Sequence, residues 1–124
     1  MSLEEAIFTH LKNDASVAAL VGTRIYPLEM HAPPTLPAIV YQRIDGVPRN
    51  HLRGGTTKIN ARIQIDCYGE EYADAKAVAA VVRTAMNSWP VGFKALLISD
   101  RDFEEERTAL KRVLMEFSVW GDDA

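Results

Sequence analysis

The side chains that could carry out chemistry in this sequence are three histidines, one cysteine and a cluster of carboxylates. Histidine and cysteine can bind a metal, or act together as a base and a nucleophile. His10, His31 and His51 lie at no metal-ligand spacing from one another or from Cys67. Cys67 alternates with isoleucines, which favours a small core residue over an exposed thiolate. For His10, in an apolar stripe, we prefer a boundary position with a satisfied ring nitrogen.

The carboxylates make a second candidate site in one short charged segment. Asp100 and Asp102 are followed by the three glutamates of residues 104–106, with arginines on either side. Carboxylates at this density can bind a divalent cation or transfer protons. The simplest interpretation is a hydrated hairpin turn, and a subunit contact through Asp102, Glu104 and Glu105 comes second. A metal-dependent enzyme ranks behind both interpretations.

A basic segment, RNHLRGGTTK, covers residues 49–58 and carries Arg49, His51, Arg53 and Lys58. Sites for single-stranded nucleic acid usually add aromatic stacking partners, and this segment has none. A hydrated loop is one interpretation. The other is an electrostatic contact, in which this segment of one copy meets the acidic segment of the next. Such a head-to-tail contact closes into a ring when the rotation between copies permits it.

Composition excludes several classes of function. The 124 residues fit one domain, 1–124, and the net charge of −3 is unlike that of a duplex DNA binder. No apolar run approaches the roughly 20 residues that cross a bilayer, and a single cysteine fits a reducing compartment. Phosphate-binding loops and nucleophile-elbow motifs are absent. We therefore expect no cofactor, no metal and no enzymatic activity.

Hydrophobic periodicity predicts an α+β fold. It predicts helices over 3–13, 15–21 and 70–87, and strands over 38–44, 57–68, 93–99 and 109–120. RIYP, which ends at Pro27, is expected to be a brief extended piece, and residues 100–108 a charged turn. The expected architecture is a mainly antiparallel four-stranded sheet with helices on one face, in the order α-α-β-β-α-β-β.

The stretch KINARIQIDCYG, residues 58–69, predicts a two-sided strand of about twice the common length. Its isoleucine side should lie under the helices, and its polar side should be available to a partner. The excess length suggests that part of the ribbon projects beyond the core. On the last strand, Leu114 and Trp120 should face outward, and they are candidates for apolar subunit contact.

Four stretches carry a resemblance to a known family: VGTRIYP, LPAIVYQRI, QIDCYGEEYADA and RVLMEFSVW. In this order the chain resembles the tail completion, or tail terminator, proteins of long-tailed phages and prophages. The resemblance implies a small α+β subunit that assembles with itself as a ring, a hexamer, at the head-proximal end of the tail tube. The ring would end tube growth and dock the head connector. It implies a virion protein, made in the bacterial cytoplasm, with no membrane partner.

The same resemblance implies no enzymatic activity and no cofactor. Its partners would be the tail tube protein and the head connector proteins, with at most transient contact to DNA in the lumen. An alternative is a small-ligand-binding or regulatory α+β domain without catalysis. That alternative predicts a concave pocket with converging polar groups, which the proline-rich loop 27–37 could cover.

Overall fold

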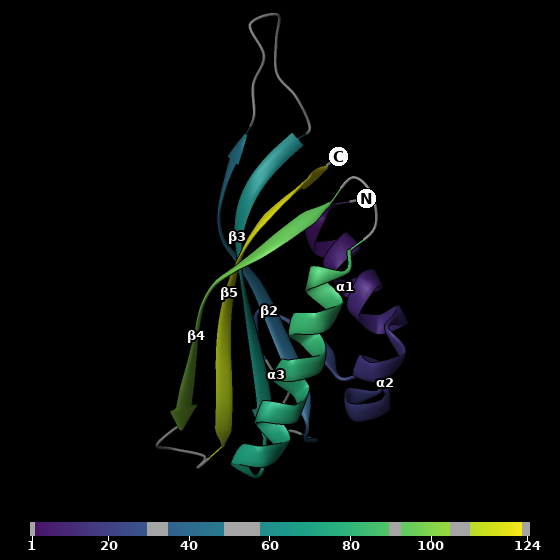
Figure 1. Ribbon diagram of the computed structural model, residues 1–124, viewed down its shortest axis with the longest axis vertical. Coiled ribbons are helices and arrows are strands. Elements are labelled where there is room, and N and C mark those ends of the chain that lie inside the picture. The colour runs from purple at the N-terminus through teal and green to yellow at the C-terminus, as the bar shows by residue number, and fades with distance from the viewer. Residues whose placement is uncertain (1, 30–34, 49–57, 90–92, 105–109, 123–124) are drawn as a thin grey trace, which may run out of the picture.

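The computed structural model describes residues 2–29, 35–48, 58–89, 93–104 and 110–122 (Figure 1). Within these residues, three helices cover one face of a five-stranded sheet. The helices are α1 (Leu3–Asn13), α2 (Ala15–Val21) and α3 (Tyr72–Asn87). The strands are β1 (Ile25–Pro27), β2 (Ala38–Pro48), β3 (Lys58–Gly69), β4 (Lys94–Glu104) and β5 (Lys111–Asp122). The predicted α+β class is confirmed.

The first two helices begin where the sequence provides a cap. In α1 the Ser2 hydroxyl accepts from the Glu5 backbone N–H at 3.2 Å, and the Ser2 backbone N–H donates to the Glu5 carboxylate at 3.3 Å. This reciprocal pair is a capping box, which satisfies two backbone donors that a helix start leaves without partners. Asp14 caps α2 through a 3.0 Å bond from the Val17 N–H. Gly22 ends α2 with a positive φ of 59°, a conformation that glycine adopts at little cost.

The sheet has the strand order β1-β2-β3-β5-β4. β1 runs parallel to β2, and the other pairs are antiparallel. The paired residues form rows across the sheet, such as Asp45, Arg62, Ser118 and Leu96. Two irregularities interrupt the rows, one between Arg43 and Asp45 in β2 and one between Leu97 and Ser99 in β4. Each leaves one isoleucine as an extra residue, and an extra residue of this kind is a β-bulge.

The core fills the space between the sheet and the helices (Figure 1). The apolar stripe of α3, which includes Val78, Val82 and Met86, is buried together with the inward side chains of the three central strands. From β2, β3 and β5 these are Ile39, Tyr41, Ile59, Ala61, Ile63, Ile65, Cys67, Val113, Met115, Phe117 and Val119. The isoleucine side of β3 is thus buried along its whole length, so the expected projection beyond the core does not occur within β3.

Three expectations about the strands need correction. The sheet has a fifth strand, because residues of the RIYP piece pair with residues 39–41 of β2 as β1. The sheet is therefore mixed rather than four-stranded and antiparallel. β4 continues to Glu104, and Phe103 and Glu104 pair with β5, where a turn was expected. Among the described residues, no helix is long and apolar enough to span a membrane.

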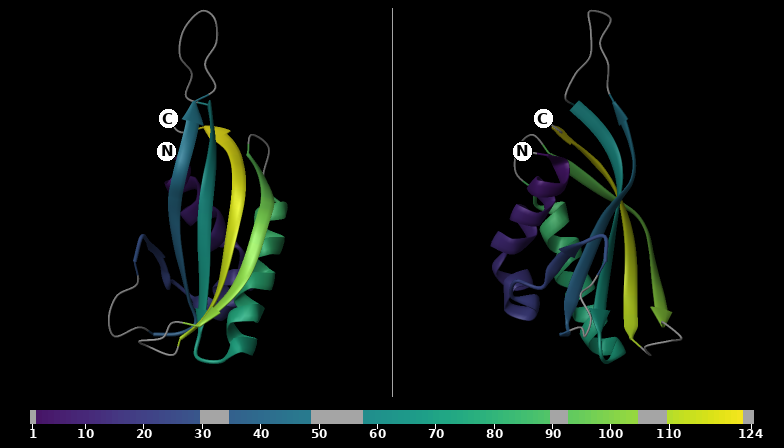
Figure 2. Two further views of the ribbon diagram at one scale, coloured as in Figure 1. Left: turned by 90° about the vertical axis from the view of Figure 1, so that its left-hand side faces the viewer. Right: turned by 180° about the vertical axis from the view of Figure 1, so that it is seen from behind.

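The sheet face opposite the helices is uncovered by any described helix (Figure 2). It carries the even-numbered residues of β3 and β5 and their partners, and we call it the open face. Not every residue on it is solvent-exposed. Asp66 is 5% exposed and Leu114 is 7% exposed, because neighbouring side chains cover them.

Candidate functional site

The predicted contact residues are distributed over different parts of the chain. Arg49, His51, Arg53 and Glu105 lie outside the described residues. Lys58 begins β3 and Glu104 ends β4, while Leu114 and Trp120 lie on β5. Leu114 and Trp120 do belong to the open face, but Leu114 is too buried to offer area to a partner. Trp120 is half-buried and is paired with Lys94 of β4 in one row of the sheet.

Asp102 is held by the main helix of its own chain. The Tyr72 hydroxyl donates to its carboxylate at 2.6 Å, and the Lys76 ammonium lies 3.0 Å from the other carboxylate oxygen. These bonds, that from Tyr72 first, keep the pKa of Asp102 below its ordinary value. The bulge at Ile98 makes this contact possible, since it turns Asp100 and Asp102 toward α3. Asp102 therefore already has partners within the protomer.

His10 and Cys67 occupy the structural positions that the sequence suggested. The His10 ring nitrogen Nε2 lies 2.6 Å from the Ala85 carbonyl oxygen, and the ring stacks on Trp89 with centroids 5.1 Å apart. Cys67 is fully buried, and burial raises the pKa of its thiol. A thiol with a raised pKa forms little thiolate, so it is a poor nucleophile. His10 thus joins α1 to α3, and Cys67 packs in the core from β3.

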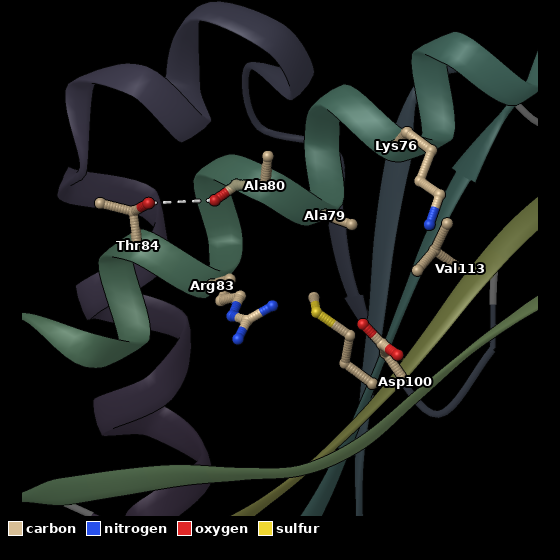
Figure 3. Close-up of a pocket in the computed structure, with 8 residues that line it drawn as sticks. Lys76, Ala79, Ala80, Arg83, Thr84, Asp100 and Val113 are labelled. Carbon is tan, nitrogen blue, oxygen red and sulfur yellow. Dashed lines mark hydrogen bonds between the residues drawn. The ribbon is translucent and has the colours of Figure 1, made fainter.

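A pocket of about 350 Å³ opens between α3 and the strands β4 and β5 (Figure 3). Lys76 and Arg83 extend from α3 beside Asp100, and Val113 and Met115 form part of its lining. The Lys76 ammonium donates hydrogen bonds to the Asp102 and Tyr72 side chains, and these bonds raise its pKa, so the amine stays protonated and cannot serve as a base. If the chain were a small-ligand-binding domain, this pocket is where its ligand would bind. It offers charged groups at its rim and no nucleophile–base pair.

The described residues also lack the ligands of a metal centre. No group of three or more histidine, cysteine or carboxylate side chains is assembled within them.

The open face carries cross-strand polar contacts between β3 and β5. Arg62 bonds to the Glu116 carboxylate at 2.9 Å, and Asn60 donates to the Ser118 hydroxyl at 2.9 Å. Lower on the face, Gln64 donates to Asp66 at 3.2 Å. The Arg112 guanidinium lies 3.6 Å from Asp66 and donates to the Tyr68 hydroxyl at 3.0 Å. Two ion pairs on this face, Arg62 with Glu116 and Arg112 with Asp66, are thus made within the protomer.

The face is also close to electrically balanced. Among the described residues it has five basic and four acidic side chains, counted from the strand pairing. They are Lys58, Arg62, Lys94, Arg101 and Arg112 against Asp45, Asp66, Glu116 and Asp122. Polyanion binding depends on a surplus of positive charge that releases counterions. The described part of the open face has a surplus of only one positive charge, which would release few counterions.

The sheet edges carry an apolar signal that the sequence analysis missed. The exposed large apolar side chains of the described residues are Leu28, Ile44, Val47, Tyr72, Leu96 and Ile98. Four of these lie on two strands: Ile44 and Val47 in β2, and Leu96 and Ile98 in β4. β4 is one edge of the sheet, and β2 is flanked by the short β1 along residues 39–41. Apolar side chains thus gather at both edges of the sheet.

The sequence matches a known family, and the fold matches a solved structure. The family model of "Tail completion protein gp17" matches residues 5–122. A chain in a solved structure titled "Virion of native gene transfer agent (GTA) particle" has a similar fold, with a TM-score of 0.75 and 22% sequence identity. The similarity covers 98% of this chain and 95% of that chain, so it extends over both folds. No curated protein matches the sequence.

Proposed function

We propose that this chain, which belongs to the family of tail completion protein gp17, is a structural subunit of a phage-type virion. The observation that carries the proposal is the family match over residues 5–122. Copies assemble into a ring, a hexamer, at the head-proximal end of the tail tube. The ring ends tube growth and presents a docking surface to the head connector. The protein acts by assembling and does not catalyse a reaction.

The positions of the sheet edges support a ring. A contact that uses two different surfaces of the same protomer is heterologous, and repeated heterologous contacts close into a ring when the rotation fits. The apolar edge residues Ile44 and Val47 lie on one side of the sheet, and Leu96 and Ile98 lie on the other. This arrangement favours a ring over a two-fold dimer, which would use one surface twice.

The partners follow from the same proposal. The structure with the similar fold is, by its title, the virion of a gene transfer agent particle. We carry this over as a location in the virion, with the tail tube protein and the head connector proteins as neighbours. DNA that passes through the ring would touch it transiently, because the described part of the open face has a surplus of only one positive charge.

The charged segments are proposed to contact subunits that lie above and below the ring, along the direction of the strands. Pro48, after which the basic segment follows, pairs with Ile59 at one end of the sheet. Glu104, at the start of the glutamate run, pairs with Lys111 at the other end. The described strands therefore lead to Arg49 and Arg53 from one end of the sheet and to Glu105 from the other. These groups suit contacts with tube or connector subunits above and below the ring better than contacts between side-by-side copies.

Growth of preformed tail tubes tests the capping function. Purified tube protein is added to short preformed tubes, and tube lengths are measured by negative-stain electron microscopy with and without this chain. A cap acts at the tube end, so growth should stop at a ratio far below one copy per tube subunit. Unchanged growth, or inhibition that needs equimolar protein, would contradict the proposal, since equimolar inhibition indicates sequestration of free subunits.

A further inference from the structure

We propose that neighbouring copies join through their sheet edges, with β4 of one copy pairing with β2 of the next. The contact uses residues 94–98 of β4 and residues 44–47 of β2, and it makes one continuous sheet around the ring. This inference rests on the proposed ring and specifies the surface that builds it. The partner it names is a second copy of this chain.

Both edges are open in the described part of the protomer. β1 pairs with residues 39–41 of β2, and the residues beyond them have β3 as their one strand partner there. β4 pairs with β5 on one side and with no described strand on the other. An open edge presents backbone N–H and C=O groups that can pair with another strand. Figure 2 shows β2 and β4 on opposite sides of the sheet.

Exposed apolar side chains lie at both of these edges. Natural edges are commonly protected by charged side chains, by proline or by β-bulges that twist the edge away, and each of these two edges has one bulge. Here Ile44, Val47, Leu96 and Ile98 are between 45% and 54% exposed. An isoleucine occupies each of the two bulges. Burying these four side chains against a second copy would remove apolar area from water on both sides of one contact.

The register places both edge segments at the same level. Asp45 and Leu96 lie in one row, through Arg62 and Ser118. Val47 and Lys94 lie in the next open-face row, through Asn60 and Trp120. A neighbour can therefore join without sliding along the strands. A contact without translation along the axis closes into a ring, whereas one with translation builds a helix.

Strand direction and charge agree with the same contact. β2 and β5 run one way and β3 and β4 run the other, because the intervening pairs are antiparallel. Placed side by side in the same orientation, β4 and the next copy's β2 are therefore antiparallel. In this register Asp45 of one copy faces Leu96 of the other, and Lys94 is its diagonal neighbour. Opposite charges on diagonal positions of adjacent strands attract.

Disulfide trapping tests the contact in the full-length protein. Residues directly opposite on antiparallel strands have Cα atoms about 4.5–5.5 Å apart, which is within the range of a disulfide. The double variants Asp45→Cys/Leu96→Cys and Val47→Cys/Lys94→Cys are mixed with tail tubes and mildly oxidised. Cys67 can stay, because it is fully buried. Each double variant should give a covalent ladder that ends at the size of the closed ring.

Two control variants, together with the presence or absence of rings, separate the possible results. Asp45→Cys/Ala77→Cys pairs the β2 position with an exposed helix residue, and it should give no ladder. If rings form on the tubes but neither double variant cross-links, edge pairing is wrong and the ring proposal stands. If Leu96→Cys alone gives dimers, the edges pair about a two-fold axis and the inference is overturned. If no ring forms at all, both proposals are overturned.

A charge substitution gives a second measurement that does not depend on oxidation. Leu96→Asp should weaken assembly on tubes at least tenfold, because it places a carboxylate in the apolar contact beside Asp45. The matched control is Leu28→Asp, which makes the same change at a leucine that is 72% exposed and outside the proposed contact. Equal assembly of the two variants would overturn the inference.

Discussion

Asp102 shows how a surface carboxylate can be fixed in one geometry. Asp102 accepts a hydrogen bond from Tyr72 and forms an ion pair with Lys76. Both partners lie on α3, so Asp102 connects the edge strand β4 to this helix. Exposed ion pairs usually contribute little to stability because water and salt screen them. The ion pair of Asp102 with Lys76 matters for geometry, because it holds the second half of β4 against α3.

The first prediction concerns acid stability. The pKa of Asp102 is lowered in the folded protein, so its contribution is present above the ordinary pKa of an aspartate and is lost as the pH falls through the lowered value. Asp102→Asn should therefore reduce the melting temperature slightly at pH 7 and leave it unchanged near pH 2. Thermal unfolding followed by circular dichroism at both values measures the difference. An equal fall of the melting temperature at both pH values would contradict this account.

The second prediction concerns Phe117, which is fully buried on β5 under the helices. Phe117→Ala should lower the free energy of unfolding by about 3–5 kcal/mol, because it removes buried area and leaves a cavity. Urea unfolding measures this quantity. Leu28→Ala is the control, and its effect should stay within about 0.5 kcal/mol because Leu28 is exposed. A similar small loss for Phe117→Ala would show that the core is placed wrongly.

At the scale of elements, helix starts and strand faces could be predicted from local sequence. Ser2 and Glu5 have the spacing of a capping box, and alternation along 58–69 indicates the buried side of β3. The extent of β4 could not be predicted, because Asp100, Arg101 and Asp102 have the composition of a turn. Their strand conformation depends on pairing with β5 and on donors from α3, and both contacts are distant in sequence.

The third prediction tests the cap of α1. Ser2→Ala removes the hydroxyl that accepts from the Glu5 N–H, and it should cost about 1 kcal/mol of stability. Chemical unfolding measures the loss. Thr9→Ala, at an exposed position in the same helix, is the matched control and should cost nothing. Loss of stability in Thr9→Ala equal to that of Ser2→Ala would contradict the capping account.

At the scale of the whole molecule, strand order decides which surfaces a partner can reach. Alternation shows which side of a strand is buried, but it does not show which strand lies at an edge. The sequence therefore pointed to the charged segments around Arg53 and Glu105 and passed over Ile44 and Leu96. The short β1 leaves part of β2 open, and that depends on a parallel pairing of three residues. The family resemblance, in contrast, could be recognised from the sequence, because it rests on stretches spread over the chain.

The fourth prediction follows from the near balance of charge on the open face. Binding of the chain to duplex DNA should be weak at low salt and should disappear near physiological salt, because few counterions are released. Fluorescence anisotropy with a labelled duplex at increasing salt measures this. Tight binding that persists at physiological salt would contradict the proposed transient contact.

The most direct test of the structural role is cryo-electron microscopy of tail tubes mixed with the purified chain. The account predicts a closed ring of identical copies at one end of each tube, with β4 of every copy beside β2 of the next. Tubes with bare ends, or with copies bound along their sides, would contradict it.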